Sequence, residues 1–568
     1  MAGCSSGHYR ESADREVYQI IENIEGQIFG QTNEFTIDTP YSDRNPNEIL
    51  PDELIEDRLS AEQHSVQLDA ALHLAVTHSR EYQTQKEQLY LTALSLSGAR
   101  FEFSPQFFAD STATLSGTGG RIESGSVRNR IGVSQLLKTG GSLSVSLAND
   151  LLRWYTGNSV GNAFGPGNDS VVNTISVNLA QPLLRGFGKN DPRVESLTQA
   201  ERNVVYAIRT FGQYQKQFAV GIVNDYFALL GQKEAVRNNY TNYLRPLDST
   251  KYLEARAVDR ARKSDVDNSR SSELIARRAY INSLAAYLNQ LDTFKITLGI
   301  PVSERLYLDD ADLQELETAG LPEVDVDKDA GFRIAVERHM DILNAIDRFE
   351  DIKRKIRIAA DQLKPGLDVV GNASLGSEEP YDYLNFDPDN IRYSVGLQLD
   401  LPVNRLRERN NYRATLVTFE SQIRSLTLTL DNFKNRIDRG LRTLEQQRLN
   451  YLNSVAQLEV IQRRVDMNEI LLKAGRTDFI ELRQSYDDLI NAQNQLTFTK
   501  VDYIQARLSL LLDLGVIQTD LDKFWLQDPL ADLLDDSQRG PGPLKMPDDT
   551  LIPPDHFLEA THELSQSH

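Results

Sequence analysis

Histidine is the residue type here that could bind a metal ion or transfer a proton near neutral pH, and its eight copies are scattered. The closest pair, His73 and His78, is five positions apart, so the two side chains do not share a helix face as metal ligands three or four apart would. The sequence contains neither a GxxxxGK[ST] phosphate loop nor a GxSxG nucleophile elbow. The acid pair Asp487-Asp488 is typical of a solvated helix face. These patterns predict no metal, no cofactor and no enzyme.

Cys4 is the single cysteine, which excludes an intrachain disulfide and a multi-cysteine metal site. It lies in Ala2-Gly3-Cys4-Ser5, the small-small-Cys pattern that ends a bacterial lipoprotein signal. The basic and apolar regions that should precede that pattern are missing, so a truncated start and a chance match both stay open. We expect Cys4 to be lipidated.

The net charge argues against nucleic acid as a partner. The chain of 568 residues has a formal net charge of -21, whereas nucleic-acid recognition needs a basic patch. No run of 18 apolar residues occurs, so a transmembrane helix is not expected. A membrane protein without apolar helices must be a β-barrel or be anchored by lipid.

The sequence contains an internal repeat, which divides the chain into two similar halves. One motif recurs 220 positions later, and each copy follows an alternating segment and precedes a long segment poor in Gly and Pro. Its shared residues are Leu179, Pro182, Arg185, Asn190 and Arg193, which recur as Leu399, Pro402, Arg405, Asn410 and Arg413. Gly299 and Gly515 end two helical stretches 216 apart, whereas Ala75 and Ala335 open two helices 260 apart. The first half therefore has about 40 additional residues before its proline motif.

Those additional residues have the alternation of β-strands. Leu143, Val145 and Leu147 alternate with serines, and Gly140-Gly141 before them is typical of a hairpin turn. Apolar residues on one face and small polar residues on the other suit a wall between lipid and water. A soluble, half-buried sheet has the same alternation, so the strands alone do not distinguish the two.

The helices favour the wall. Apolar residues from Leu416 to Leu444 recur at spacings of three and four, which is a coiled-coil seam. A helix over about 403–474 would be ~105 Å long at ~1.5 Å per residue. Helices of this length need coiled-coil partners or a wide helical barrel. Pro246 is expected to kink the first hairpin near its tip.

The predicted fold class is an α + β membrane protein with a two-fold repeat of strands and long helical hairpins. Five regions are predicted. They are an N-terminal segment, 1–64, with equatorial packing beside the helices; a first repeat, 65–300, with strands at about 99–180 that include an inserted hairpin; an equatorial linker, 301–327; a second repeat, 328–516, with strands at about 366–400; and an acidic, Pro-rich, partly disordered tail, 517–568.

On these features, residues 65–516 resemble the TolC-like outer-membrane factor family. The most specific matches are Ala474-Gly475-Arg476, the segment Leu489 to Leu496, Tyr503 and Leu514-Gly515, with Phe294 to Pro301 closing the first repeat. The resemblance implies a trimer whose strands form one β-barrel in the outer membrane, continued by a periplasmic α-helical barrel. It also implies a periplasmic adaptor protein and an inner-membrane transporter as partners.

The resemblance also implies that the hairpin tips close the periplasmic end and bind the adaptor. Glu481 aligns with a ring-forming acid of the family, whereas the second acid of that pattern aligns with Gln484. A simple surface charge is the alternative for Glu481. Candidate gate residues are Glu481, Gln484, Arg464, Arg476 and Asp478, with Arg463 and Asp466 as further ion-pair candidates. Candidate adaptor contacts are Ala261, Arg262, Ser264, Ala474, Gly475 and Thr477.

The function implied is that of a passive conduit in a tripartite efflux or secretion system of a Gram-negative-type bacterium. The alternative is a lipid-anchored periplasmic coiled-coil scaffold without a pore. Family members usually have four strands per protomer, hence twelve in the barrel. The insertion here would give eighteen, or it could stand outside the cell as a flap.

Overall fold

The computed structural model describes most of the chain, and its contacts divide the chain into two compact units. The described residues are 6–32, 34–59, 63–119, 121–154, 169–256, 263–322, 324–377, 385–401, 403–519, 523–530 and 533. The sheet unit comprises Met1–Arg44, Gln83–Gln213 and Leu343–Thr429. The hairpin unit comprises Asn45–Tyr82, Tyr214–Ile342 and Leu430–His568. The tail from 534 onward lies outside the described residues.

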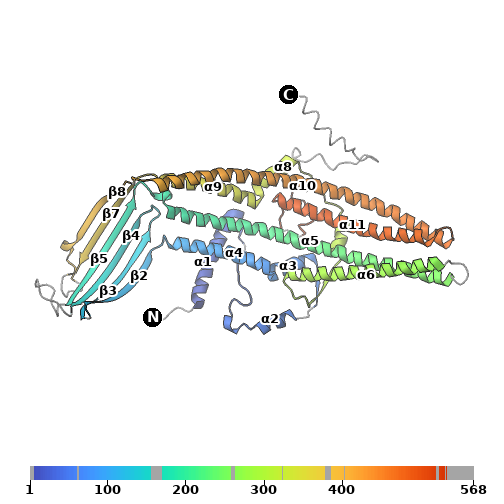
Figure 1. The fold of residues 1–568 in the computed structure, drawn as a ribbon, viewed down its shortest axis with the longest axis horizontal. Coiled ribbons are helices and arrows are strands. Elements are labelled where there is room, and N and C mark those ends of the chain that lie inside the picture. The colour runs from blue at the N-terminus through green and yellow to red at the C-terminus, as the bar shows by residue number, and fades with distance from the viewer. Residues whose placement is uncertain are drawn as a thin grey trace, which may run out of the picture. The chain divides into compact units, whose positions relative to one another are not determined.

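Long helices and long strands dominate the described chain (Figure 1). The helices are α1 (Ser6–Phe29), α2 (Pro51–Arg58), α3 (Leu68–His78), α4 (Arg80–Phe101), α5 (Pro192–Arg256), α6 (Lys263–Leu298), α7 (Ala311–Ala319), α8 (Lys328–Arg338), α9 (Met340–Asp361), α10 (Leu406–Lys473) and α11 (Phe479–Asp513). The strands are β1 (Gln63–Val66), β2 (Gln106–Thr118), β3 (Arg121–Leu136), β4 (Ser142–Trp154), β5 (Asp169–Pro182), β6 (Arg305–Leu308), β7 (Gly366–Gly376) and β8 (Arg392–Asp400). Single turns of 3₁₀ helix lie at Pro46–Glu48, Gly188–Asn190 and Pro388–Asn390.

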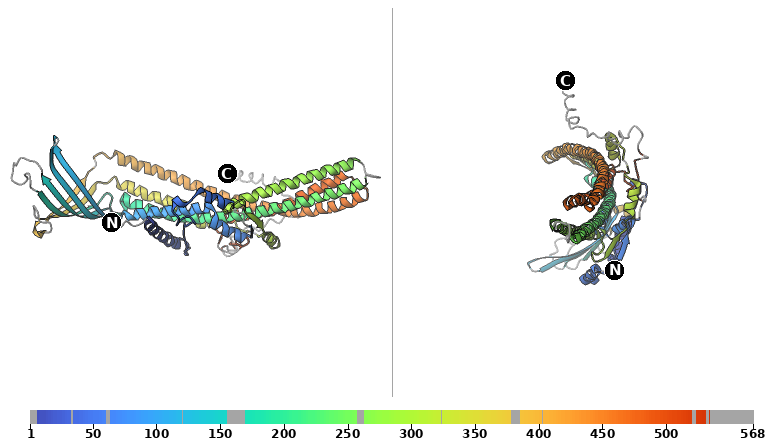
Figure 2. Two further views of the ribbon diagram at one scale, coloured as in Figure 1. Left: turned by 90° about the horizontal axis from the view of Figure 1, so that it is seen from below. Right: turned by 90° about the vertical axis from the view of Figure 1, so that its right-hand side faces the viewer.

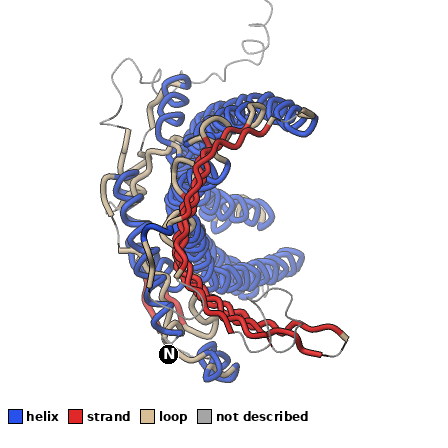
Figure 3. The backbone as a smooth tube through the Cα atoms, turned by 90° about the vertical axis from the view of Figure 1, so that its left-hand side faces the viewer, coloured by secondary structure: helices blue, strands red, loops and turns tan. Residues whose placement is uncertain are grey.

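The sheet unit contains one antiparallel sheet of six strands in the order β2-β3-β4-β5-β7-β8. The sheet is strongly curved, as the red strands in Figure 3 show. The inserted hairpin, β3 and β4, lies inside the sheet and pairs with β2 on one side and β5 on the other. Its strands form because Ser and apolar residues alternate through them, and Gly140 turns the chain with φ +85°.

Four helices connect to this sheet, and their contacts define the order α4, α5, α9, α10. Helices α4 and α5 share an apolar cluster that includes Leu96 and Ile208. Between α5 and α9, the Tyr206 hydroxyl donates to Asp351 at 2.6 Å. Between α9 and α10, the rings of Phe349 and Phe419 stack with centroids 5.5 Å apart. Each helix runs directly into, or out of, one strand: α4 precedes β2, α5 follows β5, α9 precedes β7 and α10 follows β8.

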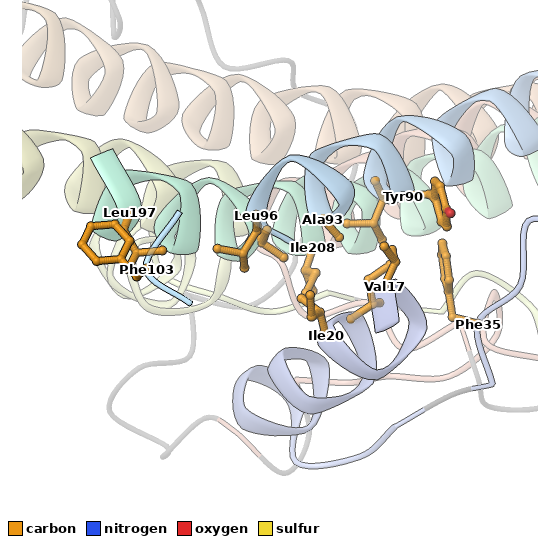
Figure 4. Packing of buried hydrophobic residues seen from close by; sticks show 12 residues of the cluster. Val17, Ile20, Phe35, Tyr90, Ala93, Leu96, Phe103, Leu197 and Ile208 are labelled. Carbon is orange, nitrogen blue, oxygen red and sulfur yellow. The ribbon is translucent and has the colours of Figure 1, made fainter. Parts of the chain in front are cut away.

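Helix α1 covers α4 and α5 with one apolar face (Figure 4). Val17 and Ile21 are fully buried against Ala93 of α4 and Val204 of α5. Burying such side chains contributes about 1.5–3 kcal/mol each, which makes α1 an integral layer of the unit. Polar contacts at the rim include the Tyr90 hydroxyl, which donates to Asp14 at 2.6 Å.

The hairpin unit is built on two long pairs of helices, α5 with α6 and α10 with α11 (Figures 1 and 2). The second pair reverses at a short turn between Lys473 and Phe479. Helix α5 is continuous through Pro246. It contacts α6 through Tyr240 and Tyr280, whose rings are 5.4 Å apart, and α11 through Asn238. Strands β1 and β6 pair in parallel beside these helices.

Two helix breaks in the hairpin unit have matching backbone surroundings. Ser79 separates α3 from α4, and His339 separates α8 from α9. The backbone of the first break packs on Gly299, which has φ +84°, and that of the second packs on Gly515, with φ +73°. Each glycine ends its long helix with the 6→1 and 5→2 hydrogen bonds of a Schellman motif.

Candidate functional site

The tip of the second hairpin is a tight turn that follows the C-terminus of α10. The Arg476 amide donates to Leu471 O at 2.9 Å and the Gly475 amide donates to Leu472 O at 3.0 Å. This is a Schellman motif, in which Gly475 takes the left-handed conformation at φ +71°. Ala474, Gly475 and Arg476 are all exposed, so the turn presents backbone and small side chains to the surroundings.

The start of α11 is fixed by two predicted gate residues. Asp478 is the N-cap, and its carboxylate accepts from the Glu481 amide at 3.1 Å. The Glu481 carboxylate accepts from the Thr477 hydroxyl at 2.6 Å. Asp478 at the cap and Glu481 in the first turn both lie where the helix dipole favours negative charge. Glu481 and Gln484 are exposed.

The remaining predicted charges divide between partners on their own helix and partners across the hairpin. Arg464 of α10 forms an ion pair with Asp488 of α11, and both side chains are partly exposed. Arg463 pairs with Glu459 one turn earlier at 3.7 Å, and Asp466 accepts from Gln462 at 3.2 Å. Among the described residues, no ion pair within 4.0 Å joins Arg464 to the other predicted gate acids, Asp466 and Asp478.

Each member of the acid pair Asp487-Asp488 has an arginine partner within the hairpin. Asp488 pairs with Arg464, and the Asp487 carboxylate lies 3.5 Å from the Arg483 guanidinium. Beside it, a groove of about 720 Å³ is lined by residues of both helices, among them Val460, Arg464 and Asn491. The tip therefore combines a small-residue turn with a polar, partly exposed groove.

At the first hairpin, Ser264 lies in the first turn of α6. Ala261 and Arg262, predicted as adaptor contacts, lie outside the described residues, and so does Cys4.

One face of the six-stranded sheet is apolar across its whole width. The paired residues of one row across all six strands are Phe107, Val133, Val145, Val177, Ala373 and Tyr393. Phe107 and Tyr393, on the two outermost strands, are 85% and 77% exposed. In the described residues, β2 and β8 each have one partner strand, so both edges of the sheet end in unpaired backbone.

The opposite face has small polar residues and paired charges. Its adjacent row, from β2 to β8, is Gln106, Ser134, Ser144, Asn178, Asn372 and Ser394. Arg130 of β3 pairs with Asp110 of β2 at 3.2 Å, and Arg128 pairs with Asp150 of β4. The two arginines are therefore neutralised by the neighbouring strands.

Sequence reasoning missed a polar row on the apolar face. Ser111 donates to Asn129, Asn129 to Asn149 and Asn149 to Asn173, at 2.5–3.4 Å, across β2 to β5. These side chains satisfy one another, which reduces the cost of placing amides among apolar neighbours. The signal was available, because the three asparagines fall opposite one another once the hairpins are paired at their turns.

Among the described residues, no group of three or more His, Cys, Asp and Glu side chains is arranged to hold a metal ion. None of the described helices has both the length and the hydropathy of a membrane-spanning segment.

No family model matches the sequence, and no curated protein matches it. Solved structures do match the fold. CusC, described as forming a transmembrane channel, is similar over 80% of this chain and 93% of its own, with a TM-score of 0.59 and 11% identity. The open MtrE outer-membrane channel of Neisseria gonorrhoeae matches over 79% and 88%, with a TM-score of 0.58 and 12% identity. The CmeC outer-membrane channel of Campylobacter jejuni matches over 79% and 85%, with a TM-score of 0.56 and 13% identity.

These structures match the fold of this chain over about four fifths of its length. At this low sequence identity, the likeness establishes the fold. The chain has the fold of the TolC-like outer-membrane factors, as the residues of its repeat and its second hairpin predicted.

Proposed function

We propose that the chain is the outer-membrane channel component of a tripartite efflux or secretion system, a passive homotrimeric conduit from periplasm to exterior. The carrying observation is the apolar row from Phe107 to Tyr393, which crosses all six strands and is exposed or partly exposed in each. A lipid-facing wall has this composition, with polar side chains facing the water-filled side. The proposed cyclic trimer joins the sheets into one barrel and the helices into a periplasmic tunnel.

The two edges of the sheet support closure by copies of the same chain. One edge is β2, from the first half of the chain, and the other is β8, from the second half. Pairing β8 of one copy with β2 of the next removes both edges, and three such head-to-tail contacts close a ring.

The long helices of the hairpin unit repeat that arrangement. Helix α6, from the first half, exposes Leu274, Ile281 and Leu288 at heptad spacing. Helix α10, from the second half, exposes Val460 and Met467, also seven residues apart. Each set forms an apolar seam that suits a neighbouring helix in a coiled coil. Contact between α6 of one copy and α10 of the next would join the first half of one chain to the second half of its neighbour, as the pairing of β2 with β8 does.

The tips complete the proposed assembly. The turn from Ala474 to Thr477, exposed at its first three residues, is the proposed surface for a periplasmic adaptor, together with Ser264, Ala261 and Arg262. The adaptor connects to an inner-membrane transporter. Three copies of Glu481 would surround the axis as a ring of negative charge that favours cations. Lipidation of Cys4 would add an anchor in the outer-membrane lipid.

Neighbouring residues of β4 test the membrane face. Val145 lies on the apolar face and Ser146 on the polar face. Val145→Arg places a charge in lipid, which costs about 2–4 kcal/mol at mid-depth, whereas Ser146→Arg faces water. We expect Val145→Arg to lower the yield and heat stability of detergent-solubilised trimers and Ser146→Arg to leave both near wild type. Equal tolerance of both arginines would argue against a lipid-facing wall.

Conduction distinguishes the conduit from a lipid-anchored scaffold. The Cys4→Ser protein should still need detergent, show threefold particles and conduct ions in planar bilayers. A water-soluble, non-conducting protein would favour the scaffold.

The predicted gate is tested by the ion pair between Arg464 and Asp488. Arg464→Glu removes this pair and should raise single-channel conductance, because an exposed pair worth about 0–1 kcal/mol suits a closure that opens. Arg476→Glu at the turn should act in the same direction. Arg424→Glu, exposed on the same helix forty residues earlier, is the control and should leave the current unchanged.

A further inference from the structure

The inserted hairpin has no helix of its own. The four helices that connect directly to the sheet follow or precede β2, β5, β7 and β8, whereas β3 and β4 connect only to strands. The sheet therefore has six strands attached to four helices. Both layers belong to one compact unit, so their widths can be compared directly.

Elementary spacings give the width of each layer. Helices packed side by side are about 8–10 Å apart, so four helices cover an arc of about 36 Å. Strands are about 4.8 Å apart and tilt by about 40° in a closed barrel, so each covers about 6.3 Å of circumference. Six strands then cover about 38 Å, whereas four would cover about 25 Å at the same tilt. With the hairpin, the two layers match in width, and without it they do not.

The side chains of β3 and β4 fit the wall. Val133 and Val145 continue the apolar row between Phe107 and Val177. On the other face, Ser134 and Ser144 continue the polar row with small side chains. A flap outside the membrane would not need this register on both faces.

We infer that β3 and β4 are wall strands that keep the bore as wide through the sheet as through the helices, so that the duct passes bulky, hydrated, polar cargo. The inference rests on the proposed trimeric conduit. Three copies give eighteen strands and a backbone diameter of about 36 Å, against about 24 Å for twelve strands at the same tilt. Subtracting about 10 Å for the wall leaves an opening of about 26 Å against about 14 Å.

The polar face agrees with cargo that keeps its water. Its central residues include Ser146, Ser176 and Thr174, and Arg128 and Arg130 are each paired with an aspartate of a neighbouring strand. Small hydroxyl side chains leave most of the opening to water, and neutralised charges do not retain a polar solute.

A deletion that preserves the strand directions tests the inference. Removing Arg121–Trp154 joins the end of β2 to the connection that enters β5, and β2 and β5 then run antiparallel with their apolar residues on the same face. Wild type and deletion variant are incorporated into planar bilayers, and polyethylene glycols of increasing size are added on the sheet side. Polymers that enter the opening lower the single-channel conductance.

We expect the exclusion limit to fall from about 26 Å in wild type to about 14 Å in the variant. The same limit in two conducting proteins would overturn the inference and leave the conduit standing. No conductance in either protein would refute the conduit itself, and this inference with it. If the variant does not assemble, the ring diameter of the intact trimer by electron cryomicroscopy decides. A ring of about 36 Å supports the inference, and one of about 24 Å with β3 and β4 outside it refutes it.

Discussion

The two helix breaks of the hairpin unit share a backbone and differ in the residue that makes the break. Ser79 caps α4 in the ordinary way, with its hydroxyl accepting from the Tyr82 amide at 3.5 Å. His339 caps α9 with a ring nitrogen, because Nδ1 accepts from the Asp341 amide at 3.2 Å. The imidazole is 1% exposed and its ring lies 4.7 Å from that of Phe433.

That difference makes one break sensitive to pH. Burial, helped by the nearby cations Arg436 and Lys216, lowers the pKa of His339 to about 4. The serine hydroxyl has no charge to gain. Protonation of His339 at Nδ1 would remove the acceptor that caps α9, whereas the Ser79 hydroxyl accepts its hydrogen bond at any pH in this range.

The largest expected effect concerns the backbone that the two breaks share. An alanine Cβ at position 299 would lie 2.0 Å from His78 O, and one at position 515 would lie 2.9 Å from His339 N. Gly299→Ala should cost about 2–5 kcal/mol, from the left-handed conformation and the clash together. Gly515→Ala should cost about 1 kcal/mol less or lower still, because its Cβ would be less crowded and overpacking costs about 1–3 kcal/mol. Thermal unfolding of the two variants measures the order, and equal losses would show that the breaks tolerate crowding alike.

Acid should act on the second break alone. The folded-state pKa of His339, about 4, lies below its ordinary value of 6.5, so the folded state binds fewer protons between these values. The contribution of neutral His339 to the free energy of unfolding is therefore fully present above pH 6.5. It decreases by up to about 3 kcal/mol as the pH falls towards 4.

His339→Gln should flatten this part of the stability curve, and unfolding measured from pH 7 to 4 provides the comparison. A variant that keeps the full acid sensitivity would place its source elsewhere. His78, at the first break, is exposed and supplies a matched control as His78→Gln.

Loss of the ordinary cap should be mild. Ser79→Ala removes one long hydrogen bond from the start of α4 and should cost about 0.5–1 kcal/mol, at the low end for N-caps. Thermal unfolding at neutral pH gives the value. A loss as large as that for Gly299→Ala would mean that the hydroxyl has a further role in the break.

The smallest effect should come from the cation beside His339. Arg436→Gln removes a positive charge and should raise the His339 pKa by less than about one unit, since burial is the larger cause. Titration of the imidazole by NMR measures the shift, with Arg439→Gln, exposed on the same helix, as the control. An unchanged pKa would show that Arg436 does not contribute and would leave burial and Lys216 as the causes.

The long elements were predictable because their patterns are local. The seam from Leu416 to Leu444 predicted most of α10, and the serine alternation around Val145 predicted β4. The pairing of β1 with β6 was missed, because four residues give no clear alternation and their partners lie some 242 positions away. Helix α1 was missed for a related reason, since its apolar face is short and its partners are distant in sequence.

The candidate site was predictable in place and less so in detail. The turn at Gly475 and the cap at Asp478 follow from residue type, whereas the partner of Arg464 depends on hairpin register. Residues 464 and 488 are equidistant from 476, so folding the hairpin about its turn would have paired them. His339 was counted among scattered histidines, because its role comes from burial and from an amide two residues later, not from a neighbouring histidine.

The connection of every strand-bound helix to the same end of the sheet limits how such a chain can change. One additional antiparallel strand would send the chain out at the far end, away from α5 or α10, so growth must come in hairpins. A single residue added inside β4 would turn Val145 and its neighbours to the other face. The width of this sheet can therefore change only in steps of two strands, by gain or loss of a whole hairpin.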